Sequence, residues 1–352
     1  MKIDIKSMTL AEIKEAFRQE GLPAFRSLQV YRWLHRGVES FDEMSDLSLE
    51  LRHKLGEKYY ISVATVEKKL ISNYDNTVKY LFSFADNCCV ESVVMQYKHG
   101  YSICISTQVG CRMGCTFCAT GKSGFSRNLT ASEMLAQIQS AQKDLGIQIS
   151  NIVLMGMGEP LDNYQQVLRF LELVSSDEGM NIGMRHISVS TCGIVDKIYD
   201  MANRKLQCTL SVSLHAPNDN LRSQTMPINK KWGVAQLLKA CKYYSDTTRR
   251  RISFEYAMIS GLNDSDAQAQ ELAGKLKGIL SHVNLIPVND VTGNHYKKSS
   301  TQRLHAFCSI LEKHGITATV RRTLGSDIQA SCGQLQRRYK EEVNNIESAQ
   351  SN

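Results

Sequence analysis

Long apolar stretches are missing from this sequence of 352 residues. No run approaches the ~18 apolar residues that a membrane-spanning helix needs, so we expect no contact with a membrane. The amino terminus, Met1-Lys-Ile-Asp-Ile-Lys6, lacks the apolar segment of a signal peptide, and we therefore expect a cytoplasmic protein. Internal repeats and low-complexity segments are also missing. The composition, 42% hydrophobic and 22% charged residues, is that of an ordinary globular protein.

Eleven cysteines in a long cytoplasmic chain indicate metal or redox chemistry, and not a disulfide framework. Three of them occur in the segment Cys111-Arg-Met-Gly-Cys115-Thr-Phe-Cys118, and no fourth cysteine follows nearby. Structural zinc sites and ferredoxin-type clusters use four thiolates. Three thiolates on a four-iron cluster leave one iron open to a substrate or cofactor. The alternative to a cluster is that the three cysteines only pack in the protein core, where cysteine is often buried. The arginine and glycine between them do not form the apolar face that such packing needs.

The amino-terminal part of the chain carries helical signals. The capping box from Thr9 to Glu12 predicts the start of one helix. Apolar spacing predicts a second helix over residues 27–36 and a third around residues 47–55. Residues 61–97 change to β-forming side chains with turn signals between them, which predicts strands. We therefore expect a small accessory domain of helices and strands.

The rest of the chain alternates short β-rich runs with helical patterns. Such alternation is typical of βα units around a parallel sheet. Six units favour a partial barrel over a closed eightfold one. The expected fold is therefore α/β, a partial (β/α)6 barrel behind the accessory domain. The expected barrel strands are residues 101–106, 151–155, 186–190, 209–214, 252–258 and 282–286.

Polar and glycine-rich segments follow these expected strands. In a parallel barrel, functional residues gather at the carboxyl ends of the strands. The cysteine segment follows the first strand, and Gly156-Met-Gly-Glu-Pro160 follows the second. A lone Gly-x-Gly is a weak signal, but this one lies beside the strand that leads to the cysteines. The remaining strand ends are Ser190-Thr191, Ser213-Leu-His215 and Pro287-Val-Asn289.

The chain has a net charge of +7, and its basic residues form short clusters. Several such clusters on one face would contact the phosphates of a nucleic acid. Solvated surface charge is the more common explanation for any single pair, so charge alone does not establish this partner. The clusters are Lys68-Lys69, Lys230-Lys231, Arg249-Arg250-Arg251, Lys297-Lys298, Arg321-Arg322 and Arg337-Arg338.

The C-x3-C-x2-C spacing, with Phe117 before its last cysteine, resembles the radical S-adenosylmethionine (SAM) signature. Over residues 20–340 the chain resembles the RlmN/Cfr family of radical SAM RNA methyltransferases. This resemblance implies a radical SAM barrel, one [4Fe–4S] cluster with three cysteine ligands, and an RNA-binding accessory domain. The matching segments are Cys104-Ile-Ser-Thr-Gln108, Ala119-Thr-Gly121, Met155-Gly-Met-Gly-Glu-Pro160, Ser188-Val-Ser190-Thr, Ser213-Leu-His215-Ala-Pro, Met226-Pro-Ile-Asn229 and Asp327-Ile-Gln-Ala-Ser-Cys332-Gly-Gln-Leu335.

The resemblance implies methylation of carbon 2 of adenine in 23S rRNA and in tRNA. Methylation of carbon 8, the sister activity that confers ribosomal antibiotic resistance, stays open because it shares all of these motifs. Since a ring carbon flanked by nitrogens is no nucleophile, the implied route uses two SAM molecules per turnover. One SAM methylates a cysteine, and the second supplies the radical that activates this methyl group for addition to adenine. A second cysteine then releases the protein–RNA adduct and forms a disulfide.

The family motifs assign the protein's part of this route to three residues. Cys332 matches the cysteine that carries the methyl group, and Cys104 matches the cysteine that resolves the adduct. Glu91 matches the acceptor of the ring proton. Strand alternation also places Glu91 on one face with Cys89 and Val93, although a glutamate in a strand more often faces solvent.

The resemblance also assigns the residues that hold the cluster and SAM. Cys111, Cys115 and Cys118 match the cluster ligands, whereas Cys192 is interpreted as a packing residue and not as a fourth ligand. His215 alone would be as well explained by a structural role. The residues that match SAM contacts are Gly158, Glu159, Ser190, Ser213, Leu214, His215 and Asn289.

We expect an accessory RNA-binding domain over residues 1–96, a core barrel over 97–326 and a catalytic-cysteine segment over 327–352. We also expect a monomer that takes electrons from a donor such as flavodoxin or ferredoxin. Two other functions stay open on the sequence alone. A radical SAM enzyme for a small molecule or protein would leave Cys104 and Cys332 unexplained. A zinc-dependent RNA-binding module would need a fourth ligand.

Overall fold

A ten-stranded sheet organises the chain in this computed structural model, which describes residues 2–288, 296–328, 330 and 335–336. Seven neighbouring strands are parallel, and three antiparallel strands continue the sheet on one side. The parallel strands are β6 (Gly100–Cys104), β9 (Ile149–Leu154), β10 (Ile187–Thr191), β11 (Thr209–Ser213), β12 (Ile252–Met258), β13 (Ser281–Pro287) and β14 (Ala318–Val320). The antiparallel strands are β5 (Cys89–Tyr97), β4 (Val78–Ser83) and β3 (Thr65–Ile71).

The sheet does not close into a complete barrel. Its strand order is β14-β13-β12-β11-β10-β9-β6-β5-β4-β3, so β14 and β3 lie at opposite edges. The predicted partial barrel is confirmed, and all six predicted strands are present. The strand β14 was not predicted, because three residues are too few to show an alternating pattern.

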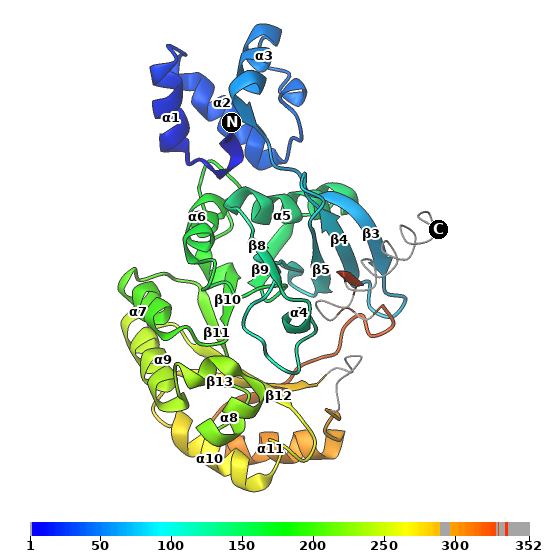
Figure 1. Ribbon diagram of the computed structural model, residues 1–352, viewed down its shortest axis with the longest axis vertical. Helices are drawn as coiled ribbons and strands as arrows, with labels where there is room; N and C mark the ends of the chain where they lie inside the picture. Colours follow the sequence, from blue (N-terminus) through cyan, green and yellow to red (C-terminus); the bar gives the residue numbers. More distant parts are fainter. Residues whose placement is uncertain (1, 289–295, 329, 331–334, 337–352) are drawn as a thin grey trace.

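Helices alternate with the parallel strands and cover one face of the sheet (Figure 1). The first of them starts at a capping box that Thr130 and Glu133 form. Because every crossover between parallel strands needs such a connection, this alternation follows directly from the sequence pattern. The helices are α5 (Ala131–Leu145), α6 (Tyr164–Val174), α7 (Val195–Asn203), α9 (Val234–Thr248), α10 (Asp266–Leu276) and α11 (Thr301–Lys313).

The parallel strands have one apolar and one more polar face. Val189, Val212 and Phe254 belong to the hydrophobic core that the strands share with the helices. Side chains alternate along a strand, so Ser190 and Ser213 lie on the opposite face, inside the partial barrel. The candidate SAM-contact residues on β10 and β11 therefore lie on the inner face.

A small helical module precedes the sheet and lies at one end of the barrel (Figure 1). Its helix α1 starts at the predicted capping box of Thr9 and Glu12. Arg169 of α6 forms an ion pair with Glu12 at 2.7 Å, which connects the module to the barrel. The module contains β1 (Ile3–Asp4), α1 (Leu10–Gln19), α2 (Ala24–Arg36), α3 (Leu49–Lys58) and β2 (Tyr59–Tyr60).

The strands β3, β4 and β5 continue the barrel sheet and do not form a separate sheet with the helical module. The expected domain boundary at residue 96 lies inside β5. Within the described residues, no helix is long and apolar enough to span a bilayer.

Candidate active site

The three cysteines of the predicted cluster motif lie in one loop. The loop starts after β7 (Gln108–Gly110) and ends at α4 (Ala119–Lys122), and β7 pairs with β8 (Phe125–Asn128) at its base. The Cys111 N–H donates to the carbonyl oxygen of Gly124 at 2.8 Å. The Thr116 N–H donates to the carbonyl oxygen of Thr225 at 3.0 Å, which ties the loop to the segment after β11. All three cysteines are half-buried.

The donor set of this loop fits an iron–sulfur cluster. Burial raises the pKa of Cys111 to about 12, and it raises the pKa of Cys115 further. Thiols with raised pKa values give up their protons when a metal binds. Among the described residues, no three His, Cys, Asp or Glu side chains are arranged as ligands of a single metal ion. Cysteines that each bind a different iron of one cluster do not need that arrangement.

Two glycines let the segment after β9 lie against the residues that lead into the cysteine loop. The Gly156 N–H donates to the carbonyl oxygen of Ile105 at 3.0 Å, and a Cβ at Gly156 would lie 2.5 Å from this oxygen. Gly158 has a φ of +102°, and a Cβ there would lie 2.6 Å from the Cβ of Gln108. Only glycine permits both this backbone conformation and this close approach.

The buried carboxylate of Glu159 is held by backbone N–H groups. Its Oε1 accepts from the Leu161 N–H at 3.0 Å, and its Oε2 accepts from the Cys192 N–H at 2.7 Å. The Glu159 N–H donates to Oε1 of Gln108 at 2.8 Å. Burial raises the pKa of Glu159, and the N–H donors oppose this rise. The side chain of Cys192 is buried in the hydrophobic core, while its backbone orients Glu159.

His215 lies two residues after the end of β11 and contacts the cysteine loop. The ring of Phe117 packs edge-on against the His215 ring, with 4.8 Å between the centroids. The Ala257 N–H donates to Nδ1 of His215 at 2.9 Å, so the proton of the neutral ring lies on Nε2. Burial lowers the pKa of His215 to about 3, and the positive charge of Arg222 contributes. His215 is therefore a neutral hydrogen-bond donor near neutral pH.

Arg222 is a fully buried residue of α8 (Asp219–Thr225) that the motifs did not predict. Its guanidinium donates to the carbonyl oxygens of Leu214 at 3.1 Å and Cys192 at 2.5 Å, and to Oδ1 of Asn229 at 3.0 Å. It also donates to the carbonyl oxygen of Ser213 at 3.1 Å. These bonds fix the chain after β10 and after β11, where the candidate SAM contacts lie. The sequence offers no signal for this role, because arginine is ordinarily exposed.

Glu91 is buried on the inner face of β5, as strand alternation suggested. It forms an ion pair with Lys79 of β4 at 2.9 Å, and both side chains are only 1% exposed. Its Oε1 accepts from the Gln336 N–H at 2.7 Å. On the same strand, Val93 is paired with Cys104 of β6, so Glu91 and Cys104 share the inner face two residues apart in register. Lys79 was not predicted.

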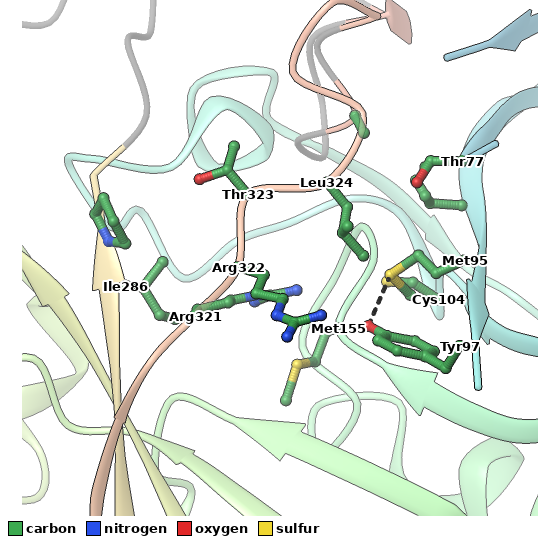
Figure 2. A pocket seen from close by; sticks show the side chains of 13 residues that line it. Thr77, Met95, Tyr97, Cys104, Met155, Ile286, Arg321, Arg322, Thr323 and Leu324 are labelled. Atoms are coloured by element: carbon green, nitrogen blue, oxygen red, sulfur yellow. Dashed lines mark hydrogen bonds between the residues drawn. The ribbon is translucent and has the colours of Figure 1, made fainter. Parts of the chain in front are cut away.

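Cys104 lines a cavity of about 350 Å³ (Figure 2). Cys104 is the last residue of β6, and Met155 and Arg321 directly follow β9 and β14. The cavity therefore reaches the carboxyl ends of the parallel strands, where barrel enzymes carry their active sites. Its other lining residues are Thr77, Val93, Met95, Tyr97, Ile286, Pro287, Arg322, Thr323, Leu324 and Ala330.

Cys332 and Asn289 lie outside the described residues. The described residues before Cys332 are tied to the turn between β3 and β4. Asp327 accepts from the Ser72 hydroxyl at 2.7 Å, and the Gly325 N–H donates to Asp75 at 2.8 Å. After Cys332, Gln336 is tied to Glu91 of β5. The described residues on both sides of Cys332 thus contact the antiparallel part of the sheet.

Two family models match the chain. The model described as the radical SAM superfamily matches residues 105–273, which include the cysteine loop and the first barrel strands after it. The model described as the ribosomal RNA large subunit methyltransferase N-terminal domain matches residues 3–61. The second match corresponds to the helical module.

Similar relatives cover almost the whole chain. A protein of Alkaliphilus oremlandii named "probable dual-specificity RNA methyltransferase RlmN" is 52% identical over 338 residues, which are 96% of this chain and 98% of that protein. A protein of the same name from Clostridium novyi is 50% identical over 337 residues, with 96% and 98% covered. The crystal structure of a radical SAM methyltransferase from Sphaerobacter thermophilus is 42% identical, with a TM-score of 0.90 over 94% of this chain and 98% of that chain.

Proposed function

The chain belongs to the RlmN family of radical SAM RNA methyltransferases, and we propose that it methylates carbon 2 of adenine in 23S rRNA and in tRNA. The observation that carries this proposal is the shared inner face of Cys104 and Glu91. A candidate nucleophile and a candidate base lie there, on neighbouring strands. Radical SAM chemistry alone would require the loop but neither of these two residues.

Three cysteines hold the cofactor in this proposal. Cys111, Cys115 and Cys118 are the ligands of a [4Fe–4S] cluster, which radical SAM enzymes use together with SAM. The cluster and SAM supply the methyl group and the radical that activates it. His215 donates from Nε2, and Arg222 fixes the backbone at which SAM is bound. The proposed SAM contacts are Gly158, Glu159, Ser190, Ser213, Leu214, His215 and Asn289.

The remaining chemistry belongs to the chain's own residues. Cys332 carries the transferred carbon and bonds it to the adenine ring. Glu91 accepts the proton that leaves the ring carbon, and its ion pair with Lys79 keeps the carboxylate in place. The thiolate of Cys104 then attacks the sulfur of Cys332 and forms a disulfide. The electron pair of the broken bond between sulfur and carbon passes to the transferred carbon, which takes up a proton and becomes the methyl group.

The names of the relatives favour carbon 2 over carbon 8. The similar relatives are named as dual-specificity RlmN enzymes, and none of those described above is named for the resistance activity. We further propose that the chain is a cytoplasmic monomer that receives electrons from flavodoxin or ferredoxin. The division at residues 96 and 326 stays a prediction.

A Gly158→Ala variant should bind SAM at least about tenfold more weakly than the wild type. Its Cβ would lie 2.8 Å from the Gln108 backbone nitrogen, and Gln108 in turn accepts from the Glu159 N–H. Gly146→Ala is the matched control, because Gly146 also has a positive φ (+62°) but no atom within 4 Å of its Cβ. The left-handed φ of Gly146 costs an alanine about 1 kcal/mol, so the control shows the effect of a positive φ without a clash. Equal SAM dissociation constants from equilibrium dialysis would remove Gly158 from the site.

The proposed function is tested by nucleoside mass spectrometry after anaerobic reaction with methyl-labelled SAM. The substrates are unmodified 23S rRNA fragments and tRNA transcripts. We expect labelled 2-methyladenosine in both. Labelled 8-methyladenosine would assign the chain to the other branch of the family, and product in only one RNA would exclude dual specificity. Absence of label, with full iron content, would contradict the proposed substrate.

A further inference from the structure

Arg321 and Arg322 lie at the cavity that Cys104 lines (Figure 2). They directly follow β14, and the Arg321 N–H donates to the carbonyl oxygen of Leu285 on β13 at 2.9 Å. The sheet therefore fixes the point from which both side chains project. In Figure 2 they extend into the space between Ile286 and Tyr97.

Both guanidinium groups are available to an anion. In the described part of the chain, neither forms an ion pair or a side-chain hydrogen bond, although the charge of Arg321 acts on Glu255 of β12. Glu255 is instead held by the Ser253 hydroxyl and the Asn284 amide, each at 2.8 Å. Both arginines are exposed. Since the planar guanidinium matches the oxygens of a phosphate, two unpaired arginines at a cavity favour a phosphate ligand.

The walls of the same cavity suit a nucleobase. Met95, Met155 and Leu324 supply apolar surface, and Tyr97 supplies an aromatic ring. Proteins that bind unpaired RNA bases place them against apolar and aromatic side chains while cations hold the backbone. The cavity combines both features within reach of Cys104.

The other basic clusters that the structure describes differ in position or pairing. Lys69 of β3 forms an ion pair with Asp144 at 2.6 Å. Arg250 donates to the hydroxyl of Thr209, the first residue of β11, and so lies at the amino ends of the strands. Neither residue is among those that line the cavity with Cys104.

We propose that Arg321 and Arg322 bind the phosphates that flank the target nucleotide when its base enters this cavity. The proposal rests on the proposed function, because it takes RNA as the substrate. It gives two of the chain's basic residues a specific role, which is to bind phosphates beside the reacting nucleotide. Each arginine contributes one phosphate contact, whereas the base is held by the apolar walls.

The test compares an Arg321→Ala/Arg322→Ala variant with an Arg251→Ala/Lys277→Ala control. Arg251 and Lys277 are exposed and lie at the amino ends of β12 and β13, so the control removes the same charge at the far end of the barrel. Fluorescence anisotropy with a labelled, unmodified tRNA transcript gives the dissociation constant at several salt concentrations. Incorporation of labelled methyl into the protein without RNA gives an independent measure of SAM binding and folding.

We expect the cavity variant to bind the transcript at least about tenfold more weakly. The slope of log affinity against log salt should fall by about 1.4, since each phosphate contact with a single strand contributes about 0.7. The control variant should lose neither affinity for the transcript nor RNA methylation activity to the extent that the cavity variant does. Methyl incorporation into the protein without RNA should be unchanged in both variants. The proposal would be overturned if the cavity variant bound RNA as tightly as the control variant. It would also be overturned if the cavity variant lost methyl incorporation into the protein without RNA, because this result would assign the arginines to SAM binding. A wild type that neither binds nor methylates RNA would instead overturn the proposed function.

Discussion

A Cys104→Ala variant is expected to accumulate a covalent protein–RNA adduct and to lose multiple turnover. The substitution leaves the cluster loop and Glu91 unchanged, so Cys332 can still be joined to adenine. Without the Cys104 sulfur, no group displaces the product from Cys332. Cys104 is buried and lines the cavity, so solvent thiols have little access to replace it. Intact-mass analysis after single-turnover reaction should show the protein with one bound RNA.

Cys308→Ala is the matched control for this experiment. Cys308 is a free cysteine of α11 on the outer side of the barrel, where its sulfur contacts Glu312 at 3.8 Å. Its removal should leave turnover unchanged and produce no adduct. A Cys104→Ala protein that is found only as free protein, despite iron and methyl incorporation equal to the control, would exclude Cys104 as the resolving residue.

A Glu91→Gln variant should form the adduct but release product about 10²–10⁴-fold more slowly, the usual effect of losing a positioned base. Glutamine keeps an oxygen for the Gln336 N–H, which lies 2.7 Å from Glu91, but it cannot accept the ring proton. Methyl incorporation into the protein without RNA should be unaffected, because that step needs no ring proton to leave. Single-turnover assays separate the two steps.

The same substitution leaves the Lys79 ammonium buried without its carboxylate. Breaking a buried ion pair by removing one partner costs about 3–5 kcal/mol, and this pair is 2.9 Å apart with both side chains 1% exposed. Glu91→Gln should therefore unfold at a lower temperature than the wild type. A Lys79→Met/Glu91→Gln variant removes both charges and should regain most of the stability without the activity. Product release at the wild-type rate in that double variant would show that Glu91 is not the base.

The sequence was sufficient to predict the fold wherever the signal is local. The six barrel strands are apolar runs between polar turns, and the capping box at Thr9 starts α1 as expected. The cysteine loop is equally local, because all its thiols lie within one segment. In contrast, β14 has three residues and forms only because β13 offers it a parallel edge.

The unpredicted residues of the site depend on contacts between distant segments. Lys79 lies in a β-forming run where a lysine ordinarily faces solvent, and only the register of β4 and β5 brings it to Glu91. The bond between Glu91 and Gln336 joins residues 245 positions apart. Arg222 is likewise identified by the three carbonyl oxygens that it reaches in the folded chain. No local pattern encodes such partners.

The most direct test of the central claim is reaction with SAM that carries a trideuterated methyl group. In the proposed route the methyl group loses one hydrogen before its carbon is joined to adenine through Cys332. The account therefore predicts 2-methyladenosine whose methyl group contains two deuterium atoms, read from the mass of the isolated nucleoside. A product that retains all three deuterium atoms would show direct transfer of an intact methyl group, and it would contradict the roles of Cys332, Cys104 and Glu91 together.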